Sequence, residues 1–442
     1  MGWNSFDGFG VYLHEAAAWN CLDAMSAKLA PYGYEYFVID GGWHGEFKRQ
    51  PGTRYPAEKH ASELHLDRHG LPEPSRTSFP RGFAALIGET HARGLRFGLH
   101  LMRGVPRQAV QDGCRLRGSG VPLAEFALPE RTCRWCDYNL GVDVCHSGGR
   151  QYYRDLIGKL VDWGVDFLKF DDITHFPDEI EAVMDAVEAV RPDLVVSLSP
   201  GGGIDTDQLA VYGRADMLRV TPDIWDDQAS IDRGFEAMSR WQGVELERCR
   251  IDLDMIPFGA LMQMTPSTGD NGSADENAYA GKGGARICGF TSSQKRTFLV
   301  QRAILASPLM VGGDPAHFDR EDLALLGDRD IIACNQNGVT GREIDFAGQV
   351  SAYHAVDRRM AGSGWVGLFN RDPARSHRVR LTDLGIPSTP AVRWRSSDAT
   401  PTATWTGGSA AQETDLSLPP GDAVLLRYTP PTPIKGSPVE MG

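Results

Sequence analysis

Short apolar segments alternate with amphipathic segments along the first three quarters of the chain, a pattern typical of parallel strands joined by crossover helices. The clearest unit begins with the apolar run Val165–Phe170, which predicts a buried strand ending at Asp171. A stretch with apolar residues at helical spacing follows, and Pro177 suits its first turn. The run Leu194–Leu198 predicts the next strand. This part of the chain is therefore expected to form a β-α-β unit.

The same alternation recurs before and after this unit. Further strands are predicted at Gly2–Ser5, Tyr36–Asp40, Arg96–Leu101, Met217–Val220, Ile251–Asp254 and about Ile304–Met310. Together with the two strands above, they make eight. Eight parallel strands with intervening helices predict an α/β fold, a (β/α)8 TIM barrel over residues 1–338, in which Gln108–Gly149 forms an enlarged loop.

The pattern changes after about Gly341. Period-two segments without helical spacing predict antiparallel strands at Val350–Val356, Trp365–Phe369, His377–Leu381 and Ala423–Tyr428. Turn signals such as Asn370–Pro373 separate these segments. We therefore expect a C-terminal antiparallel β-sandwich over residues 339–429. The Pro-rich tail, residues 430–442, has too little apolar content to pack.

Carboxylates stand where two of the predicted barrel strands end. Asp171 closes one strand, and Asp223 lies just past another, two strands further round the barrel. Neighbouring strands are about 4.8 Å apart, so these carboxylates can face each other across a space the size of a sugar. A retaining glycosidase needs two carboxyl groups about 5 to 5.5 Å apart, one as nucleophile and one as proton donor and base. The alternative is a buried ion-pair network that stabilises the barrel rim.

Basic residues accompany both carboxylates. Lys169 precedes Asp171 by two residues and shares its face of the strand, where it would help to keep Asp171 ionised. Asp172 points to the opposite face, which makes it the weaker candidate for the nucleophile. Arg219 is expected either to act like Lys169 or to bind a sugar hydroxyl.

Other strand ends also carry polar or aromatic residues. Asp40, His100 and Asp254 are candidates for substrate contacts, because the chemistry of a TIM barrel lies at the C-terminal ends of its strands. For His100 the alternative is a core histidine with satisfied hydrogen bonds. Trp43 and Trp225 flank Asp40 and Asp223, and their rings could stack on a sugar or pack in the core.

Composition narrows the classes of function. Of the 442 residues, 41% are hydrophobic and ten are Trp, which is enough apolar surface for a sizeable core. The chain has 45 Lys and Arg against 58 Asp and Glu, and the resulting net charge of −13 repels phosphate backbones and anionic membranes. Nucleic acid and membrane partners are therefore not expected, whereas a homo-oligomer stays open.

The chain as given is expected to be soluble. No stretch approaches the roughly 18 apolar residues of a membrane span, and Met1–Asn4 has neither the basic nor the apolar region of a signal peptide. The compartment stays open: cytoplasmic as given, or secreted or periplasmic if the start is processed.

Eight cysteines are too sparse for a disulfide framework in a chain of this length. Cys133 and Cys136 form a CxxC motif that Cys145 and His146 follow, and these four residues could hold zinc. No second CxxC or HxxxH stands at a regular distance, however. We expect free thiols ahead of a local disulfide and of a zinc site, and therefore neither metal nor cofactor.

Five segments carry a resemblance that spans almost the whole chain. They are Met1–Phe6, Tyr34–Asp40, Trp163–Asp171, Asp252–Met255 and Cys334–Gln336. In this order they resemble motifs of the α-galactosidase-type glycoside hydrolases, family 27. The resemblance implies a (β/α)8 barrel and a metal-independent retaining mechanism, with Asp171 as nucleophile and Asp223 as acid/base beside Arg219. It also implies sugar-hydroxyl contacts from Asp40, Lys169 and Asp254, with Phe6 as a hydrophobic wall.

The chain differs from this family at positions that determine substrate specificity. The relatives carry paired acids after the second strand, which grip the O4 and O6 hydroxyls of galactose, and here the second acid is replaced by Gly41. His100 stands at the family's third-strand aromatic, and Ser199–Gly203 replaces the acidic and aromatic residues after the fifth strand. Ile173 replaces a cysteine that lies two residues after the nucleophile in the relatives, so that disulfide cannot form.

The expected function is that of a retaining, exo-acting α-glycoside hydrolase. It would cleave terminal α-linked sugars, α-D-galactosyl groups first, from an oligosaccharide or glycoside through a covalent glycosyl-aspartate intermediate. The alternatives are the same chemistry on an α-glucan, as in an isomaltodextranase, or on β-L-arabinopyranosides, which resemble α-galactosides without the C6 carbon. A catalytically silent carbohydrate-binding homologue is a further alternative, but the intact pair of Asp171 and Asp223 favours an enzyme.

Overall fold

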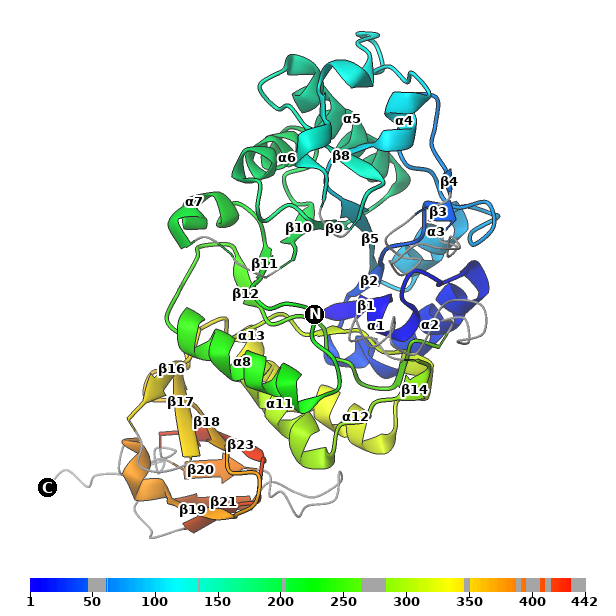
Figure 1. The fold of residues 1–442 in the computed structure, drawn as a ribbon. Coiled ribbons are helices and arrows are strands. Elements are labelled where there is room, and N and C mark those ends of the chain that lie inside the picture. Colours follow the sequence, from blue (N-terminus) through cyan, green and yellow to red (C-terminus); the bar gives the residue numbers. More distant parts are fainter. Residues whose placement is uncertain are drawn as a thin grey trace, which may run out of the picture. The chain divides into compact units, whose positions relative to one another are not determined.

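The structure is a computed structural model. It describes residues 1–46, 61, 63–133, 136–200, 204, 206–263, 284–345, 350–386, 391–394, 406–409 and 415–430. The chain forms two compact units (Figure 1). The first contains Met1–Ser230, Leu246–Gly289 and Pro308–Leu323, and the second contains Ile231–Glu245, Phe290–Ser307 and Ala324–Gly442. The domain limits after residues 338 and 429 stay predictions, and residues 431–442 of the tail lie outside the described residues.

Eight parallel strands form a curled sheet in the first unit (Figure 1). The strands are β1 (Gly2–Asn4), β2 (Tyr36–Ile39), β5 (Arg96–Met102), β9 (Phe167–Asp171), β10 (Val195–Leu198), β11 (Met217–Arg219), β12 (Arg250–Asp252) and β15 (Met310–Val311). Their order is β12-β11-β10-β9-β5-β2-β1-β15. A parallel bridge between Ile256, just after β12, and Val311 of β15 links the two ends of this order. The sheet with this link fits the predicted (β/α)8 barrel.

Helices connect most of these strands along the chain, and others follow the last strand. They are α1 (Phe6–Phe9), α2 (Glu15–Lys28), α3 (Ala84–Ala92), α4 (Arg107–Gln111), α5 (Ser147–Trp163), α6 (Pro177–Val190), α7 (Leu209–Tyr212), α8 (Gln228–Trp241), α11 (Ser292–Ile304), α12 (Arg320–Leu326) and α13 (Arg329–Gln336). The predicted helix after Asp171 is confirmed as α6, with Pro177 in its first turn. Within the described part of the chain, every helix is too short or too polar to cross a membrane.

Short strands and a 3-10 turn also form in the first unit. The strands are β3 (Gly45–Glu46), β4 (Glu63–Leu64), β6 (Val105–Pro106), β7 (Ala127–Leu128), β8 (Asn139–Val142), β13 (Ala260–Leu261) and β14 (Arg286–Ile287). Of these, β7 and β8 lie within the predicted enlarged loop and form a three-stranded sheet with β6, which lies just before it. The 3-10 turn Pro129–Arg131 lies in the same loop.

Apolar side chains fill the barrel below the strand ends. Val38, Phe167, Met217, Met255 and Met310 form one buried cluster. A side chain at Gly98 would come within 2.8 Å of Val38 and 3.0 Å of Phe167, so this glycine leaves the room that both side chains occupy. This apolar cluster supports the polar residues at the strand ends.

The eighth strand is shorter than predicted. The apolar run from Ile304 to Met310 is not one strand, because Ile304 ends helix α11 and only Met310–Val311 pairs with β1. A capping box of Thr291 and Gln294 starts that helix, which carries Ile304 with it. Periodicity alone does not distinguish a short buried strand from the end of a buried helix.

Two antiparallel sheets form in the C-terminal part of the second unit. The larger has the order β16-β17-β18-β23-β20-β21, and the smaller pairs β19 with β22. Their strands are β16 (Arg342–Ile344), β17 (Val350–Val356), β18 (Gly364–Asn370), β19 (His377–Arg380), β20 (Ala391–Trp394), β21 (Thr406–Ser409), β22 (Asp415–Leu418) and β23 (Ala423–Thr429). Val350 and Leu426 of the larger sheet share one buried cluster with Val379 and Leu418 of the smaller sheet. This arrangement is consistent with the predicted sandwich.

Candidate active site

The polar residues predicted for the site lie at the C-terminal ends of the barrel strands. Asp40 directly follows β2, Asp171 ends β9 and Arg219 ends β11. In the ladder between β5 and β9, His100 is the direct partner of Lys169. Strand β10 separates β9 from β11, as predicted, so it also lies between the strands that carry Asp171 and Asp223.

Both carboxylate oxygens of Asp171 have hydrogen-bond partners. The backbone N–H of Asp172 donates to Oδ1 at 3.0 Å, and Nε2 of His100 lies 3.4 Å from Oδ2. Burial alone would raise the pKa of Asp171. The hydrogen bond with His100 and the positive charges of Lys169 and Arg219 outweigh burial and hold this pKa well below its usual range. Asp171 is therefore ionised at neutral pH.

Asp40 forms a buried ion pair with Lys169. Nζ of Lys169 lies 2.9 Å from its Oδ2, and Nδ2 of Asn4 donates to the same oxygen at 2.7 Å. Burial alone would raise the pKa of Asp40, but the charges of Lys169 and His100 lower it to about 2. Lys169 was predicted to act on Asp171, and its charge does so, but its direct ion pair is with Asp40.

Two residues near Asp40 were not singled out from the sequence. Asn4 binds the carboxylate of Asp40, and Oγ of Ser5 accepts the backbone N–H of Asp40 at 2.9 Å. Both belong to the first motif, Met1–Phe6, and Asn4 ends strand β1. Their polarity at a strand end was the available signal. Phe6 follows them, and its ring centroid lies 5.8 Å from Nζ of Lys169.

Asp223 lies in a more open environment. Its side chain is 48% exposed, and its Oδ1 lies 3.0 Å from Nη1 of Arg219. The same nitrogen lies 3.2 Å from Oδ2 of the buried Asp254, which also accepts the backbone N–H of Ile224. Burial alone would lower the pKa of Arg219, but the charges of Asp254 and Asp223 raise it above its usual range. A permanently charged guanidinium thus holds a carboxylate that water can reach.

A small cavity, partly open to solvent, lies beside Lys169 and Arg219. It is lined by the polar residues Asn4, Lys169, Ser197, Ser199, Arg219, Asp252 and Asp254 and by the apolar residues Phe167, Met217, Met255 and Met310. Oγ of Ser199 and Nε of Arg219 are buried and have no hydrogen-bond partner among the described residues. Buried polar atoms are normally satisfied, so a ligand rich in hydroxyl groups suits this cavity.

His100 and Gly41 lie next to each other. His100 is only 4% exposed, and its Nδ1 has no hydrogen-bond partner in the described part of the chain. A side chain at Gly41 would start 3.6 Å from this nitrogen, which is an ordinary contact distance. The replaced acid of the relatives therefore corresponds to a position beside His100.

Trp43 lies behind this part of the site. It is 1% exposed, and its indole N–H donates to the carbonyl oxygen of His100 at 2.7 Å. The rings of Phe83 and Trp163 pack against it. Trp225 is also buried, at 4% exposure. For both tryptophans, core packing is the interpretation that the surroundings favour, and Trp43 supports the strand that carries His100.

The cysteines are free thiols, and all eight lie in the described part of the chain. Cys133 and Cys136 are buried, whereas Cys145 is exposed. No group of three or more His, Cys, Asp or Glu residues that could hold a metal occurs among the described residues. Of the segment after the fifth strand, residues 201–203 lie outside the described residues.

Comparisons with known proteins point to glycoside hydrolases. No family model matches the chain. Alpha-galactosidase 3 of Arabidopsis thaliana is 24% identical over 454 residues, which cover 98% of this chain and 82% of the relative. Alpha-galactosidase A of Cellvibrio japonicus is 22% identical over 97% of this chain and 91% of its own length. The crystal structure of a GH27 β-L-arabinopyranosidase from Geobacillus stearothermophilus is similar with a TM-score of 0.82 and 28% identity, and 99% of this chain and 97% of that chain are covered.

The parallel sheet, the carboxylates at its strand ends and relatives that match over nearly the whole length define a glycoside hydrolase. These similarities support an α-galactosidase-type glycoside hydrolase of family 27. The family that the five motifs predicted is thereby confirmed.

Proposed function

We propose that this enzyme is a retaining, exo-acting hydrolase of terminal α-linked sugars, α-D-galactosyl groups first, carried by a closed (β/α)8 barrel followed by a β-sandwich. Its substrate is an oligosaccharide or glycoside. Asp171 attacks the anomeric carbon and forms a glycosyl ester, while Asp223 gives its proton to the departing oxygen. Asp223 then takes a proton from the water that hydrolyses the ester, which restores both carboxyl groups.

One contrast supports these two roles. Asp171 accepts hydrogen bonds on both oxygens and has a depressed pKa, whereas Asp223 is 48% exposed beside Arg219. A nucleophile must be ionised and oriented, and an acid/base must exchange protons with water. The chain thus provides one carboxylate for each task.

The remaining predicted site residues would hold the sugar. Lys169 and Asp254 line the cavity and offer charged hydrogen-bonding groups for hydroxyls, and the orphaned Nε of Arg219 offers another donor. Asp40 would bind a hydroxyl beside Lys169, with which it forms an ion pair. Phe6 would form an apolar wall, and His100 would line the side nearest to Gly41. Trp43 would act only through the strand that it supports.

A second candidate substrate is a β-L-arabinopyranoside. Gly41 removes one of the two acids that grip O4 and O6 in α-galactosidases, and an arabinopyranoside has no C6 carbon. The similar Geobacillus enzyme is named a β-L-arabinopyranosidase. No comparable observation favours an α-glucan.

A panel of aryl glycosides tests the proposal. We expect the highest kcat/KM for the α-D-galactoside, a lower value for the β-L-arabinopyranoside and the lowest for the α-D-glucoside, with unchanged rates after exhaustive chelation. Proton NMR of the first-formed sugar should show the retained anomer. If no glycoside in the panel is turned over, the proposal that the protein is an enzyme is contradicted. An inverted anomer would contradict the double-displacement mechanism. A preference for the arabinopyranoside would favour the second candidate substrate.

A further inference from the structure

A strained residue follows the nucleophile. Asp172 has a φ of +61°, in the left-handed region that residues other than glycine rarely adopt. In this conformation its backbone N–H donates to Oδ1 of Asp171 at 3.0 Å. The orientation of the Asp171 carboxylate therefore depends on the turn at Asp172.

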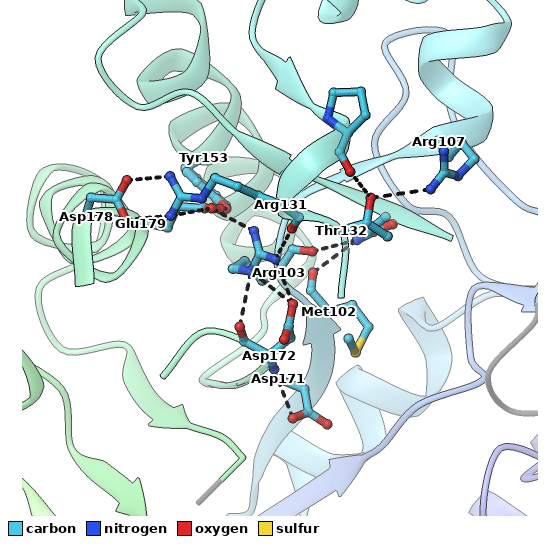
Figure 2. Close-up of polar contacts among 12 residues, drawn as sticks. Met102, Arg103, Arg107, Arg131, Thr132, Tyr153, Asp171, Asp172, Asp178 and Glu179 are labelled. Carbon is cyan, nitrogen blue, oxygen red and sulfur yellow. Dashed lines mark hydrogen bonds and ion pairs between the residues drawn. The ribbon is translucent and has the colours of Figure 1, made fainter. Parts of the chain in front are cut away.

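Arg103, directly after β5, holds this turn in place (Figure 2). Its Nε donates to both the carbonyl oxygen and Oδ2 of Asp172, each at 3.1 Å, and its Nη2 donates to Oδ2 at 2.7 Å. Its backbone N–H donates to the carbonyl oxygen of Asp171 at 2.9 Å. The guanidinium is 1% exposed, so these are buried, charge-assisted bonds.

The same guanidinium reaches a second part of the chain. Its Nη1 donates to Glu179 of helix α6 at 2.7 Å, and its Nη2 donates to the carbonyl oxygen of Arg131 at 2.6 Å. Arg131 in turn forms two hydrogen bonds of 2.7 Å with Asp178 (Figure 2). Arg131 ends the 3-10 turn within the enlarged loop, so this loop, α6 and the nucleophile strand meet at Arg103.

Asp172 also needs the charge of Arg103. Burial raises the pKa of Asp172, the neighbouring charge of Asp171 raises it further, and Arg103 opposes both effects. Without a matching guanidinium, a second buried carboxylate would lie beside the nucleophile without compensation, which destabilises the ionised form of Asp171.

We propose that Arg103 is a positioning residue: it fixes the turn at Asp172 whose N–H orients the carboxylate of Asp171, and it ties that turn to the enlarged loop through Arg131. This inference rests on the proposed role of Asp171 as nucleophile. It assigns the loop a part in catalysis without any contact between the loop and the sugar.

Arg103→Lys tests the inference, because lysine keeps the charge but loses the planar fork. We expect kcat to fall roughly ten- to a hundredfold, as for a slightly misplaced reacting group, with KM little changed. The acid limb of the profile of kcat/KM against pH should move to higher pH, since Asp171 loses part of its stabilisation. The matched control is Arg191→Lys, since Arg191 binds Asp166 at 2.9 Å and the carbonyl oxygen of Val165 at 3.0 Å, just before β9 begins. This control should lower Tm while kcat and the acid limb stay as in the wild type.

Arg131→Met tests the connection to the loop, and it decides the matter if Arg103→Lys does not fold. The variant keeps the carbonyl oxygen that accepts from Arg103, but it removes the ion pair with Asp178 that holds this part of the loop on α6. The side chain of Arg131 is 25% exposed, so its loss is tolerable, and we expect a severalfold fall in kcat with KM unchanged. The inference would be overturned if a folded Arg103→Lys kept the kcat and the acid limb of the wild type. It would also be overturned if Arg131→Met kept the kcat of the wild type, because the ion-pair cluster would then be purely structural. Asp171→Ala separates the two proposals: if it keeps near wild-type turnover, the proposed function fails, whereas an inactive Asp171→Ala beside an unaffected Arg103→Lys contradicts only the inference.

Discussion

The two carboxylates on either side of β10 lie in contrasting surroundings. Asp171 has a side chain that is 21% exposed, with His100 on one oxygen and the backbone of Asp172 on the other. Asp223 is 48% exposed and pairs with Arg219. The difference teaches how one edge of a sheet can suit two carboxylates to different tasks. Immobilisation and positive charge keep a carboxylate ionised, whereas access to water lets it exchange protons.

Removing the carboxylate of Asp171 should have the largest effect on kcat. Asp171→Ala should lower kcat by several orders of magnitude on every substrate, because no covalent intermediate can form. The measurement is steady-state turnover with Tm as the control for folding. Azide or formate should partly rescue Asp171→Gly, and a variant with near wild-type turnover would contradict the assignment of the nucleophile.

Removing the exposed carboxylate should have an effect that depends on the leaving group. Asp223→Ala should lower kcat/KM roughly 10²- to 10⁴-fold for aryl glycosides with poor leaving groups, because their oxygen needs a proton. Activated aryl glycosides need little protonation, so their kcat/KM should fall far less. An equal loss for both kinds of leaving group would mean that Asp223 is not the acid.

Specificity should respond to the position beside His100. A hydrogen bond to a carboxylate contributes roughly 1.5 to 3 kcal/mol, so Gly41→Asp should raise the preference for the α-D-galactoside over the α-D-glucoside about ten- to a hundredfold. Gly41→Ala is the matched control, since it adds a carbon at ordinary contact distance from His100 without a carboxylate. Equal kcat/KM ratios in the wild type and both variants would show that position 41 does not face the sugar.

The buried ion pair of Asp40 and Lys169 should make the free energy of unfolding depend on pH in the acid range. The pKa of Asp40 is about 2 in the folded enzyme, below its ordinary value. A depressed pKa stabilises the fold above the ordinary pKa, and this contribution, about 2 kcal/mol, is lost as the pH falls from about 4 to 2. Urea unfolding should therefore show the free-energy difference between wild type and Asp40→Asn shrinking by this amount. A constant difference across that range would contradict the ion pair with Lys169.

Much of the fold could be predicted from hydrophobic patterning. Buried parallel strands are continuous apolar runs, so Tyr36–Ile39 and Val195–Leu198 were recognisable without neighbours. The end of α11 at Ile304 was not, because a buried helix end and a buried strand present the same apolar run. Strands β20, β21 and β22 are each only four residues long, and the pattern did not predict them.

Strand periodicity predicted which site residues share a face of a strand, but not which residues contact each other. Spacing by two residues placed Lys169 and Asp171 on one face, and the position of Asp223 just past a strand two further round made it the second candidate. Neither rule shows which partners meet across strands, so the pairing of Lys169 with Asp40 and the clamp of Arg103 on Asp172 emerge only from the folded chain. The burial of Trp43 likewise depends on rings far along the sequence.

Identification of the residue that carries a trapped intermediate tests the central claim most directly. A fluorinated glycosyl fluoride of the best substrate slows the breakdown of a glycosyl ester, and mass spectrometry of the digested enzyme locates the modified residue. The account predicts one glycosyl group, attached to Asp171. Attachment to Asp172 or Asp223, or turnover of the reagent to an inverted sugar with no adduct at all, would contradict it.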